Sequence, residues 1–179
     1  MKKRIESTDS KRKIVYIKER AFLAMILSVI EVYKKESIGL LLGYSSPDEF
    51  IVEYAIPYQT AETTFSKAEP KLKAFERMSN LLQNLPVKVI GDYHSHTEFG
   101  KSKAKAIPSG EDIADMSPDK IHLILAVNAA EKNRKWNHHS NGSISGTFGN
   151  YEITIAAATL YKQNRYNKLK IICPSATGI

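Results

Sequence analysis

The sequence predicts a single-domain α/β protein in which a mixed β-sheet is flanked by helices. Three observations predict this class. The 179 residues suit one domain with a substantial core. A hydrophobic content of 42% and a charged content of 25% are ordinary for a globular protein. Short β-branched runs alternate with longer helical patterns. We expect residues 1–12 to be a flexible basic N-terminus and residues 13–179 to form the domain.

Residues 13–58 predict one helix and three strands. Residues 13–18 alternate like an edge strand, and residues 21–34 are apolar nearly all round, which indicates a buried helix. The apolar run 38–43 predicts a central strand. A turn at 44–48 joins it to a strand over 49–58, so we expect a hairpin.

After a polar loop over 59–68, residues 69–85 predict a helix whose apolar face packs on the sheet. That face carries Leu72, Phe75, Met78, Leu82 and Leu85. The remaining predicted elements are a strand over 87–93, a short helix over 109–116, a buried strand over 121–127, a hairpin or loop over 136–149, and strands over 144–148 and 151–161.

Two histidines and an aspartate are the most informative residues. His94 and His96 follow the strand pattern of 87–93, and residues i and i+2 of a strand point to the same side. Asp112 lies just inside the next predicted helix. Two histidines and a carboxylate form a three-ligand set for catalytic zinc, with a fourth position left for water. Each part alone has an ordinary reading, because Ser109 and Asp112 also match a capped helix start.

In this order and spacing the residues resemble the JAMM (MPN-plus, Mov34/JAB) metalloprotease family, in its prokaryotic JAB form. The family motif is a glutamate, then H-x-H, a spacer and S-x-x-D. It corresponds to Glu36 before the strand Ile38–Gly43, to His94-Ser95-His96, and to Ser109–Asp112. The resemblance spans about residues 13–160 and implies an MPN/JAB fold with cytidine-deaminase-like architecture.

The resemblance also implies a role for each motif residue. His94, His96 and Asp112 would hold Zn²⁺, Glu36 would be the general base, and Ser109 would stabilise the oxyanion. The expected position of Glu36 is the end of the first helix. The other candidate bases are Glu31, Glu49 and Glu53. The hydroxyl of Ser109 is also a helix cap, and we expect the two tasks to compete.

Two features depart from the family pattern. Thr97 stands where the family has proline, and the spacer of twelve residues, 97–108, is five longer than usual. A polar loop of this kind is easily accommodated, because closure entropy grows slowly with length. It is either a loop on the substrate side or a solvated insertion. Asp92 is a candidate partner for orienting the imidazoles.

The family implies that the substrate is a conjugate of a ubiquitin-like or sulfur-carrier protein. A homodimer or a partner protein is compatible with the sequence. Two alternatives stay open, a non-catalytic MPN-type scaffold and a DNA-associated protein like the RadC branch. The net charge of +7 lies largely near the chain ends, which is more often typical of solvated tails than of nucleic-acid binding.

The cysteine content and the apolar segments of the chain also bear on its cellular compartment. A single cysteine, Cys173, excludes an internal disulfide and fits a reducing cytosol. It also excludes a zinc site of the deaminase type, which needs a pair of cysteines. The N-terminus lacks the apolar segment of a signal peptide, and the longest apolar run, 21–30, is too short to cross a bilayer. We therefore expect a cytoplasmic protein without a membrane partner.

Overall fold

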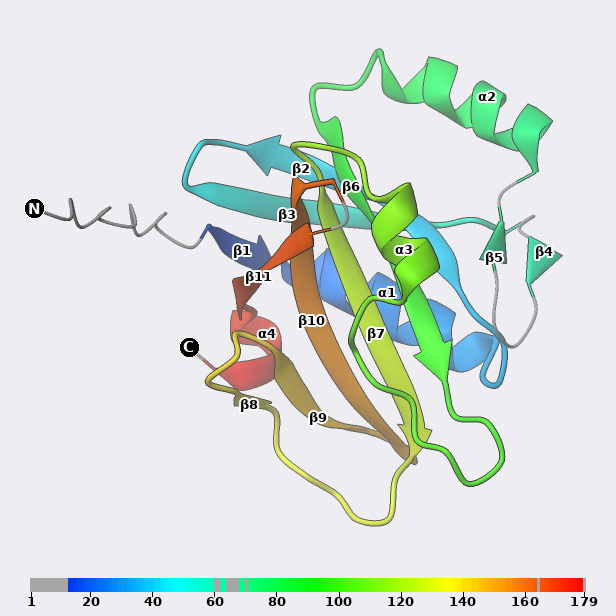
Figure 1. Ribbon diagram of the computed structural model, residues 1–179, viewed down its shortest axis with the longest axis vertical. Coiled ribbons are helices and arrows are strands. Elements are labelled where there is room, and N and C mark those ends of the chain that lie inside the picture. Colours follow the sequence, from blue (N-terminus) through cyan, green and yellow to red (C-terminus); the bar gives the residue numbers. More distant parts are fainter. Residues whose placement is uncertain (1–12, 60–61, 64–67, 70, 164, 179) are drawn as a thin grey trace, which may run out of the picture.

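Seven strands close into a β-barrel (Figure 1). The computed structural model describes residues 13–59, 62–63, 68–69, 71–163 and 165–178. Around the barrel the strands follow the order β11 (Arg165–Ile172), β1 (Ile14–Ile17), β3 (Glu49–Pro57), β2 (Ile38–Ser45), β6 (Lys88–Thr97), β7 (Ile121–Ala129) and β10 (Tyr151–Lys162). The barrel closes because β10 pairs with β7 on one side and with β11 on the other.

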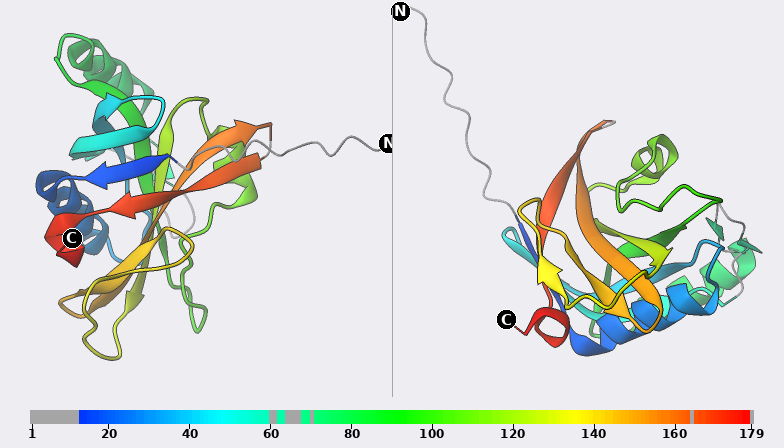
Figure 2. Two further views of the ribbon diagram at one scale, coloured as in Figure 1. Left: turned by 90° about the vertical axis from the view of Figure 1, so that its left-hand side faces the viewer. Right: turned by 90° about the horizontal axis from the view of Figure 1, so that it is seen from below.

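Smaller elements surround the barrel. β9 (Ile144–Phe148) and β8 (Asn137–His138) extend the sheet beyond β10, and β4 (Glu62–Thr63) pairs with β5 (Ala68–Glu69). The helices are α1 (Glu19–Glu31), α2 (Leu72–Leu82), α3 (Gly110–Asp115) and α4 (Pro174–Thr177). Figure 2 shows α1 and α3 on different sides of the strands. Within the described ranges, no helix has the length and apolar character needed to span a bilayer.

The predicted fold class, a mixed sheet flanked by helices, is wrong, because the described chain is mostly β and its sheet closes on itself. The missing element is β11, in a segment that the sequence analysis treated as a basic chain end. Its buried Leu169 and Ile171 alternate with the exposed Lys168 and Lys170. Such alternation marks a strand with one buried face. Because lysines are interleaved with the apolar residues, the strand that closes the barrel was not predicted from the sequence.

Most of the other predicted elements are present, with shifted ends. The antiparallel β2–β3 hairpin is confirmed. α1 ends at Glu31, and Lys34 adopts a left-handed φ of 73° in the turn that follows. The polar loop predicted over 59–68 contains β4 and part of β5. Residues 1–12 lie outside the described residues, so the expected flexible N-terminus stays a prediction.

The predicted apolar face of the second helix is only partly correct. α2 starts at Leu72 rather than Glu69 and ends at Leu82. Leu82 is buried and Met78 packs beside it, but Leu72 is 70% exposed and Leu85 is also exposed. The side chain of Phe75 lies outside the described part. The helix therefore covers the barrel with its C-terminal half.

The barrel interior and one face of α1 form the main core. Phe22, Met25 and Ile26 of α1 are buried in the same cluster as Tyr93 of β6 and Leu123 of β7. The Ser28 and Tyr93 hydroxyls lie 2.9 Å apart, so this buried polar pair is satisfied. Tyr93 therefore fixes which face of β6 points inward, and His94 and His96 must point outward.

Two smaller apolar clusters cover the outer face of the barrel. One joins Leu40, Leu42 and Val87 to Tyr58 and to Leu82 of α2. The other joins Met116, which follows α3, to Ile124 of β7 and Ala158 of β10. These clusters hold α2 and α3 over the same face that carries the two histidines.

A close approach of β6 and β7 gives a stability prediction. An added Cβ at Gly91 would lie 1.9 Å from the carbonyl oxygen of Ile121, which is a backbone atom that cannot swing away. We expect Gly91→Ala to lower the free energy of unfolding by about 1–3 kcal/mol, as other overpacked sites do. Urea denaturation measures this loss.

The matched control is Gly110→Ala, because a Cβ there would meet no atom within 4 Å. This variant should unfold within about 0.5 kcal/mol of the wild type. Equal stability of the two variants would contradict the close packing of β6 against β7.

Candidate metal centre

His94 and His96 lie near the end of β6 and project from the outer face of the barrel. β6 is paired on both sides, antiparallel to β2 and parallel to β7. Between the two histidines, Ser95 is fully buried, and its hydroxyl accepts a hydrogen bond of 2.8 Å from the backbone N–H of Ser37. The backbone N–H of Ser95 donates in turn to the carbonyl of Ser37 at 2.9 Å. These bonds hold the H-x-H segment against the chain that carries Glu36.

The three predicted ligands converge on one point. The Nε2 atoms of His94 and His96 are 3.1 Å apart, and each lies 3.3 Å from a carboxylate oxygen of Asp112. A tetrahedral zinc with bonds of 2.0–2.1 Å separates its ligand atoms by about 3.3 Å. His94 faces Oδ1 of Asp112 and His96 faces Oδ2, and one ligand atom from each of the three side chains can be chosen so that all lie within 4.8 Å of one another. The three side chains are therefore close enough to share one metal ion. In the described part of the chain, no second group of three His, Cys, Asp or Glu converges in this way.

Asp112 reaches the histidines because α3 begins with a capping box. The Ser109 hydroxyl accepts from the backbone N–H of Asp112 at 3.1 Å, and the Asp112 carboxylate accepts from the backbone N–H of Ser109 at 2.6 Å. This reciprocal pair fixes the first turn of the helix. The same carboxylate contacts both imidazoles, so helix capping and ligand placement are one arrangement.

The two tasks expected of Ser109 do not compete. A hydroxyl has one proton to donate and two lone pairs that accept. As the helix cap, Ser109 uses a lone pair. Its proton stays available for a developing negative charge beside the cluster. The expected conflict between capping and oxyanion stabilisation is therefore absent from this geometry.

Glu36 lies beside the same cluster, but not at the end of a helix as expected. It is half-buried in the segment between α1 and β2, and β2 pairs its first residue, Ile38, with His94. Glu31, Glu49 and Glu53, the other candidate bases, lie in α1 and β3. Ser95 and Ser37, which fix the position of Glu36, were not predicted as site residues. The available signal was that Ser95, between two histidines that face outward on a strand, must face inward.

The pKa values of the two carboxyl groups at the cluster, those of Glu36 and Asp112, are shifted in opposite directions. Burial raises the pKa of Glu36, although the charges of His96 and His94 act to lower it. Burial also acts to raise the pKa of Asp112, but hydrogen bonds from His94 and His96 outweigh it and hold that pKa well below its ordinary range. Such a separation suits one carboxyl to proton transfer and the other to permanent negative charge.

The backbone of the 97–108 loop supplies the partner that orients His96. The Nδ1 atom of His96 lies 3.0 Å from the carbonyl oxygen of Lys105. A carbonyl only accepts, so Nδ1 carries a proton whether the imidazole is charged or neutral. When the imidazole is neutral, Nε2 therefore presents its lone pair to the cluster. Burial acts to lower the pKa of His96, but the hydrogen bonds to Asp112 and to this carbonyl raise it overall.

The other singled-out polar residues lie elsewhere. Asp92 does not contact the ligand imidazoles as suggested; its carboxylate bonds Nδ1 of His122 at 2.9 Å. His122, in β7, is buried. His138 and His139 bond Thr177 and Ser145 in the β8–β9 region.

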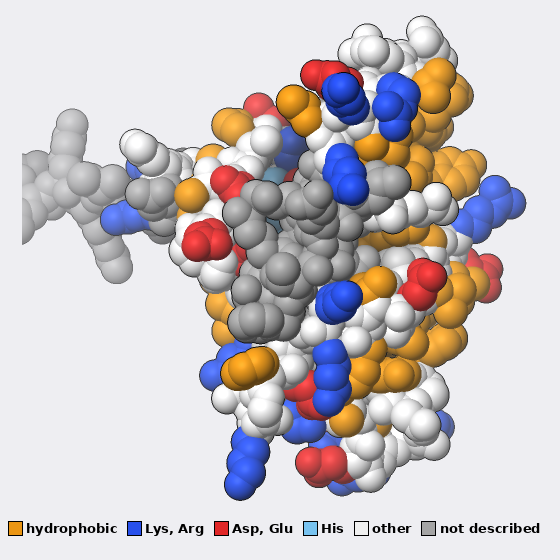
Figure 3. Space-filling view, turned by 90° about the vertical axis from the view of Figure 1, so that its right-hand side faces the viewer, with side chains coloured by type: hydrophobic (Ala, Val, Ile, Leu, Met, Phe, Trp, Pro, Cys, Tyr) orange, Lys and Arg blue, Asp and Glu red, His pale blue; other side chains and the backbone are white. Residues whose placement is uncertain are grey.

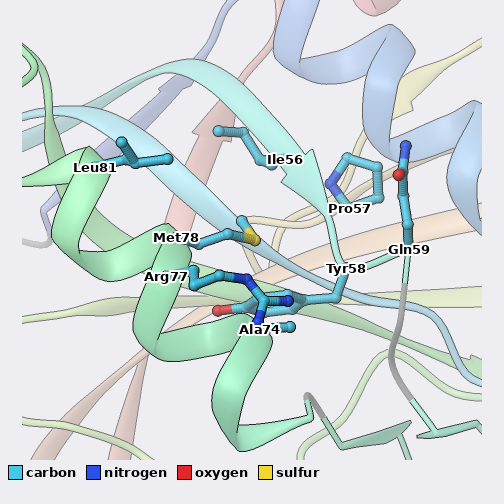
Figure 4. Close-up of a pocket in the computed structure, with 8 residues that line it drawn as sticks. All are labelled: Ile56, Pro57, Tyr58, Gln59, Ala74, Arg77, Met78 and Leu81. Carbon is cyan, nitrogen blue, oxygen red and sulfur yellow. The ribbon is translucent and has the colours of Figure 1, made fainter.

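An open pocket of about 500 Å³ lies between α2 and the end of β3 (Figure 4). Its lining residues are Ile56, Pro57, Tyr58, Gln59, Ala74, Arg77, Met78 and Leu81. Burial raises the pKa of Tyr58 to about 12, and the carboxylate of Asp92 adds to the shift. Tyr58 in the pocket wall is therefore influenced by a charge on β6, two residues before His94. Figure 3 shows hydrophobic and basic side chains together on the face that carries α2.

Comparison with known proteins identifies similar chains. Residues 18–139 match the model of a family described as prokaryotic homologs of the JAB domain. Among solved structures, the solution structure of protein DSY2949 from Desulfitobacterium hafniense is similar, with a TM-score of 0.60 and 17% sequence identity. The alignment covers 89% of this chain and 92% of that one, and at this identity it bears on the fold alone. No curated protein matches the chain significantly.

The cluster of three ligand side chains predicts one metal ion per chain. We expect the chelator-treated protein to take up one zinc ion, and His96→Ala or Asp112→Ala to weaken binding at least about 100-fold, because each removes one of three ligands. Competition with a chromophoric chelator measures this. His139→Ala is the matched control, since this exposed histidine bonds Ser145 away from the cluster. Equal affinity of His96→Ala and His139→Ala would contradict the site.

The metal-free protein should also show a defined pH dependence. The pKa of His96 is raised on folding, so its stabilising contribution is full below about pH 6.5 and is lost as pH rises through the folded value. The pKa of Asp112 is lowered, so its contribution is full above about pH 3.9 and is lost as pH falls. His96 and Asp112 together therefore stabilise the folded state most between about pH 3.9 and about pH 6.5.

Urea denaturation of wild type and Asp112→Asn without metal tests this dependence. We expect the difference in unfolding free energy to reach about 1–3 kcal/mol near pH 5–6 and to shrink above about pH 8. A difference that is independent of pH would show that the histidines and Asp112 are not coupled.

Proposed function

This chain belongs to the family of prokaryotic homologs of the JAB domain. On that premise we propose that it is a zinc-dependent hydrolase that cleaves peptide or isopeptide bonds at the C-terminus of ubiquitin-like or sulfur-carrier-type proteins. One observation carries the proposal. The Nε2 atoms of His94 and His96 lie 3.1 Å apart on the outer face of the barrel, each 3.3 Å from a different oxygen of the Asp112 carboxylate, and Glu36 lies alongside.

The chemistry of the donor set supports zinc as the metal. Two imidazole nitrogens and one carboxylate oxygen are ligands that zinc accepts readily, and three protein ligands are the usual number at a catalytic zinc. All three side chains are only 15–21% exposed, so the site is sheltered yet open to solvent. When bound there, zinc would supply Lewis acidity and make water a nucleophile at neutral pH.

Glu36 is the proposed general base and acid. Its carboxylate takes a proton from the attacking water while the water oxygen bonds the scissile carbonyl carbon. It then gives that proton to the leaving amine as the C–N bond breaks. Burial raises the pKa of Glu36, which makes its carboxylate a better proton acceptor than an exposed glutamate.

Ser109 is the proposed oxyanion donor. Its lone pair already accepts from the backbone N–H of Asp112, which fixes the hydroxyl within one helical turn of a ligand. The O–H group of Ser109 is still available to donate, and the cap limits the orientations that the hydroxyl can adopt. A preorganised donor of this kind typically contributes about 3 kcal/mol to lowering a hydrolytic barrier.

The substrate class rests on the family and on the surroundings of the centre. An extended C-terminal tail has to pass over the outer face of β6 to place a carbonyl near His94. The pocket between α2 and the end of β3 offers apolar walls with Arg77 at its side, and α2 packs on the same outer face of the barrel. Apolar side chains of a tail, and carboxylates of the protein behind it, are the groups this lining would accept.

Cleavage of a ubiquitin-like protein joined through its C-terminus to a lysine amine tests the proposal. We expect the zinc-loaded wild type to release the amine, and Glu36→Gln to reduce kcat by about 10²–10⁴-fold, because the proton acceptor is lost. Chelation should abolish cleavage, and zinc should restore it. Gel separation of the two products measures the rate.

Glu31→Gln is the matched control, because Glu31 is an exposed carboxylate at the end of α1. It should cleave at the wild-type rate. Cleavage that survives both Glu36→Gln and chelation would refute the mechanism. Zinc binding without cleavage of any conjugate would favour the alternative of a non-catalytic scaffold.

A further inference from the structure

The metal centre depends on the tautomer of His96. A neutral imidazole has one nitrogen that donates and one that accepts, and the two tautomers are close in energy in water. His96 contributes Nε2 to the cluster, so in the neutral imidazole the proton must reside on Nδ1. The only hydrogen-bond partner that the described structure gives Nδ1 is the carbonyl oxygen of Lys105, at 3.0 Å. This carbonyl belongs to the lengthened 97–108 loop, so the position of that loop bears directly on the ligand.

Asn128, near the end of β7, fixes the residue before this carbonyl. Its Oδ1 accepts from the backbone N–H of Ala104 at 2.8 Å, and its Nδ2 donates to the carbonyl of Ala104 at 3.2 Å. The amide thus bonds both polar backbone groups of one loop residue, as a neighbouring strand would. The side chain rises from β7, which pairs directly with β6, so the clamp shares a rigid base with His96.

The other side of the carbonyl is held by packing. Ala106 packs against the cluster of Met116, Ile124 and Ala158. Lys105 is therefore held between a polar clamp at Ala104 and an apolar contact at Ala106. Its exposed side chain points to solvent while its carbonyl faces His96.

The start of the 97–108 loop is also held in place by hydrogen bonds. Glu98 accepts from the hydroxyl of Tyr33 at 2.6 Å, from the backbone N–H of Ala129 at 3.2 Å and from Lys103 at 3.2 Å. Phe99 and Ser102 exchange two backbone hydrogen bonds across a tight turn, in which Gly100 has a φ of 57°. The loop is thus a folded part of the structure. This geometry disfavours a solvated insertion without a role.

We propose that Asn128 is a positioning residue for the metal centre: by clamping Ala104 it holds the Lys105 carbonyl on Nδ1 of His96 and commits Nε2 to the metal. The inference rests on the proposed metal site but concerns a residue outside the family motif. It assigns the lengthened loop a function, namely that its backbone completes the support of one ligand. Partners that orient a ligating histidine typically change metal affinity 10- to 100-fold when they are lost.

Two measurements on Asn128→Ala test this proposal. Long-range ¹H–¹⁵N correlation spectra of the metal-free protein, at a pH where the imidazoles are neutral, report which nitrogen of His96 carries the proton. We expect Nδ1–H in the wild type and a mixture of tautomers in Asn128→Ala. Zinc affinity should fall 10- to 100-fold in the same variant. A side chain that only stabilises the fold would leave the tautomer unchanged.

Asn84→Ala is the matched control, since Asn84 also donates to a backbone carbonyl, that of Asn80, but at the end of α2. It should match the wild type in both measurements. If Asn128→Ala does not fold, Asn128→Asp replaces it in both measurements. This variant keeps the side-chain shape and the acceptor for the Ala104 N–H, but it loses the N–H that donates to the Ala104 carbonyl. A folded Asn128 variant with the wild-type tautomer and zinc affinity would overturn the proposal.

The tautomer measurement separates this inference from the proposed function. If the wild type binds no zinc, the hydrolase proposal fails, yet the metal-free spectra still decide whether Asn128 sets the proton on His96. If zinc binds and cleavage occurs but the variant's tautomer is unchanged, the hydrolase proposal stands and the positioning role fails.

Discussion

The pairing of β6 between β2 and β7 is the constraint on which the candidate site depends. Both neighbours hydrogen-bond to β6, and beyond an irregularity near Ile90 its alternation is fixed over the part of the strand that carries the histidines. Tyr93 and Ser95 are fully buried, and His94 and His96 therefore project together on the outer face. A slip of one residue would bury both imidazoles and expose Tyr93. The register that forms the core is thus also the register that forms the metal centre.

The supporting elements converge on this strand from three directions. β2 brings Glu36 through the bonds between Ser37 and Ser95. α3 brings Asp112 through a capping box, and the 97–108 loop brings the Lys105 carbonyl. Each side chain therefore reaches the cluster from a different segment, yet each is fixed by local hydrogen bonds. Because the segments are held separately, the cluster does not rely on any one flexible contact.

The sequence was sufficient to predict the local features of the site and insufficient for the closure of the fold. H-x-H on a strand and S-x-x-D at a helix start are short-range patterns, and His94, His96 and Asp112 do come together. The barrel depended on β11, whose Leu169 and Ile171 are interleaved with lysines that resemble a solvated tail. The Lys105 carbonyl and Asn128 left no pattern, because a backbone group and a residue 24 positions from its partner meet only in the folded chain.

The central claim is that two imidazoles and one carboxylate share a single zinc ion, and X-ray absorption spectroscopy of the zinc-loaded chain tests it most directly. We expect about four nitrogen or oxygen ligands at about 2.0–2.1 Å, with the outer-shell scattering of two imidazoles. A shell of six oxygens without imidazole scattering would contradict it, because zinc would then be bound away from His94 and His96.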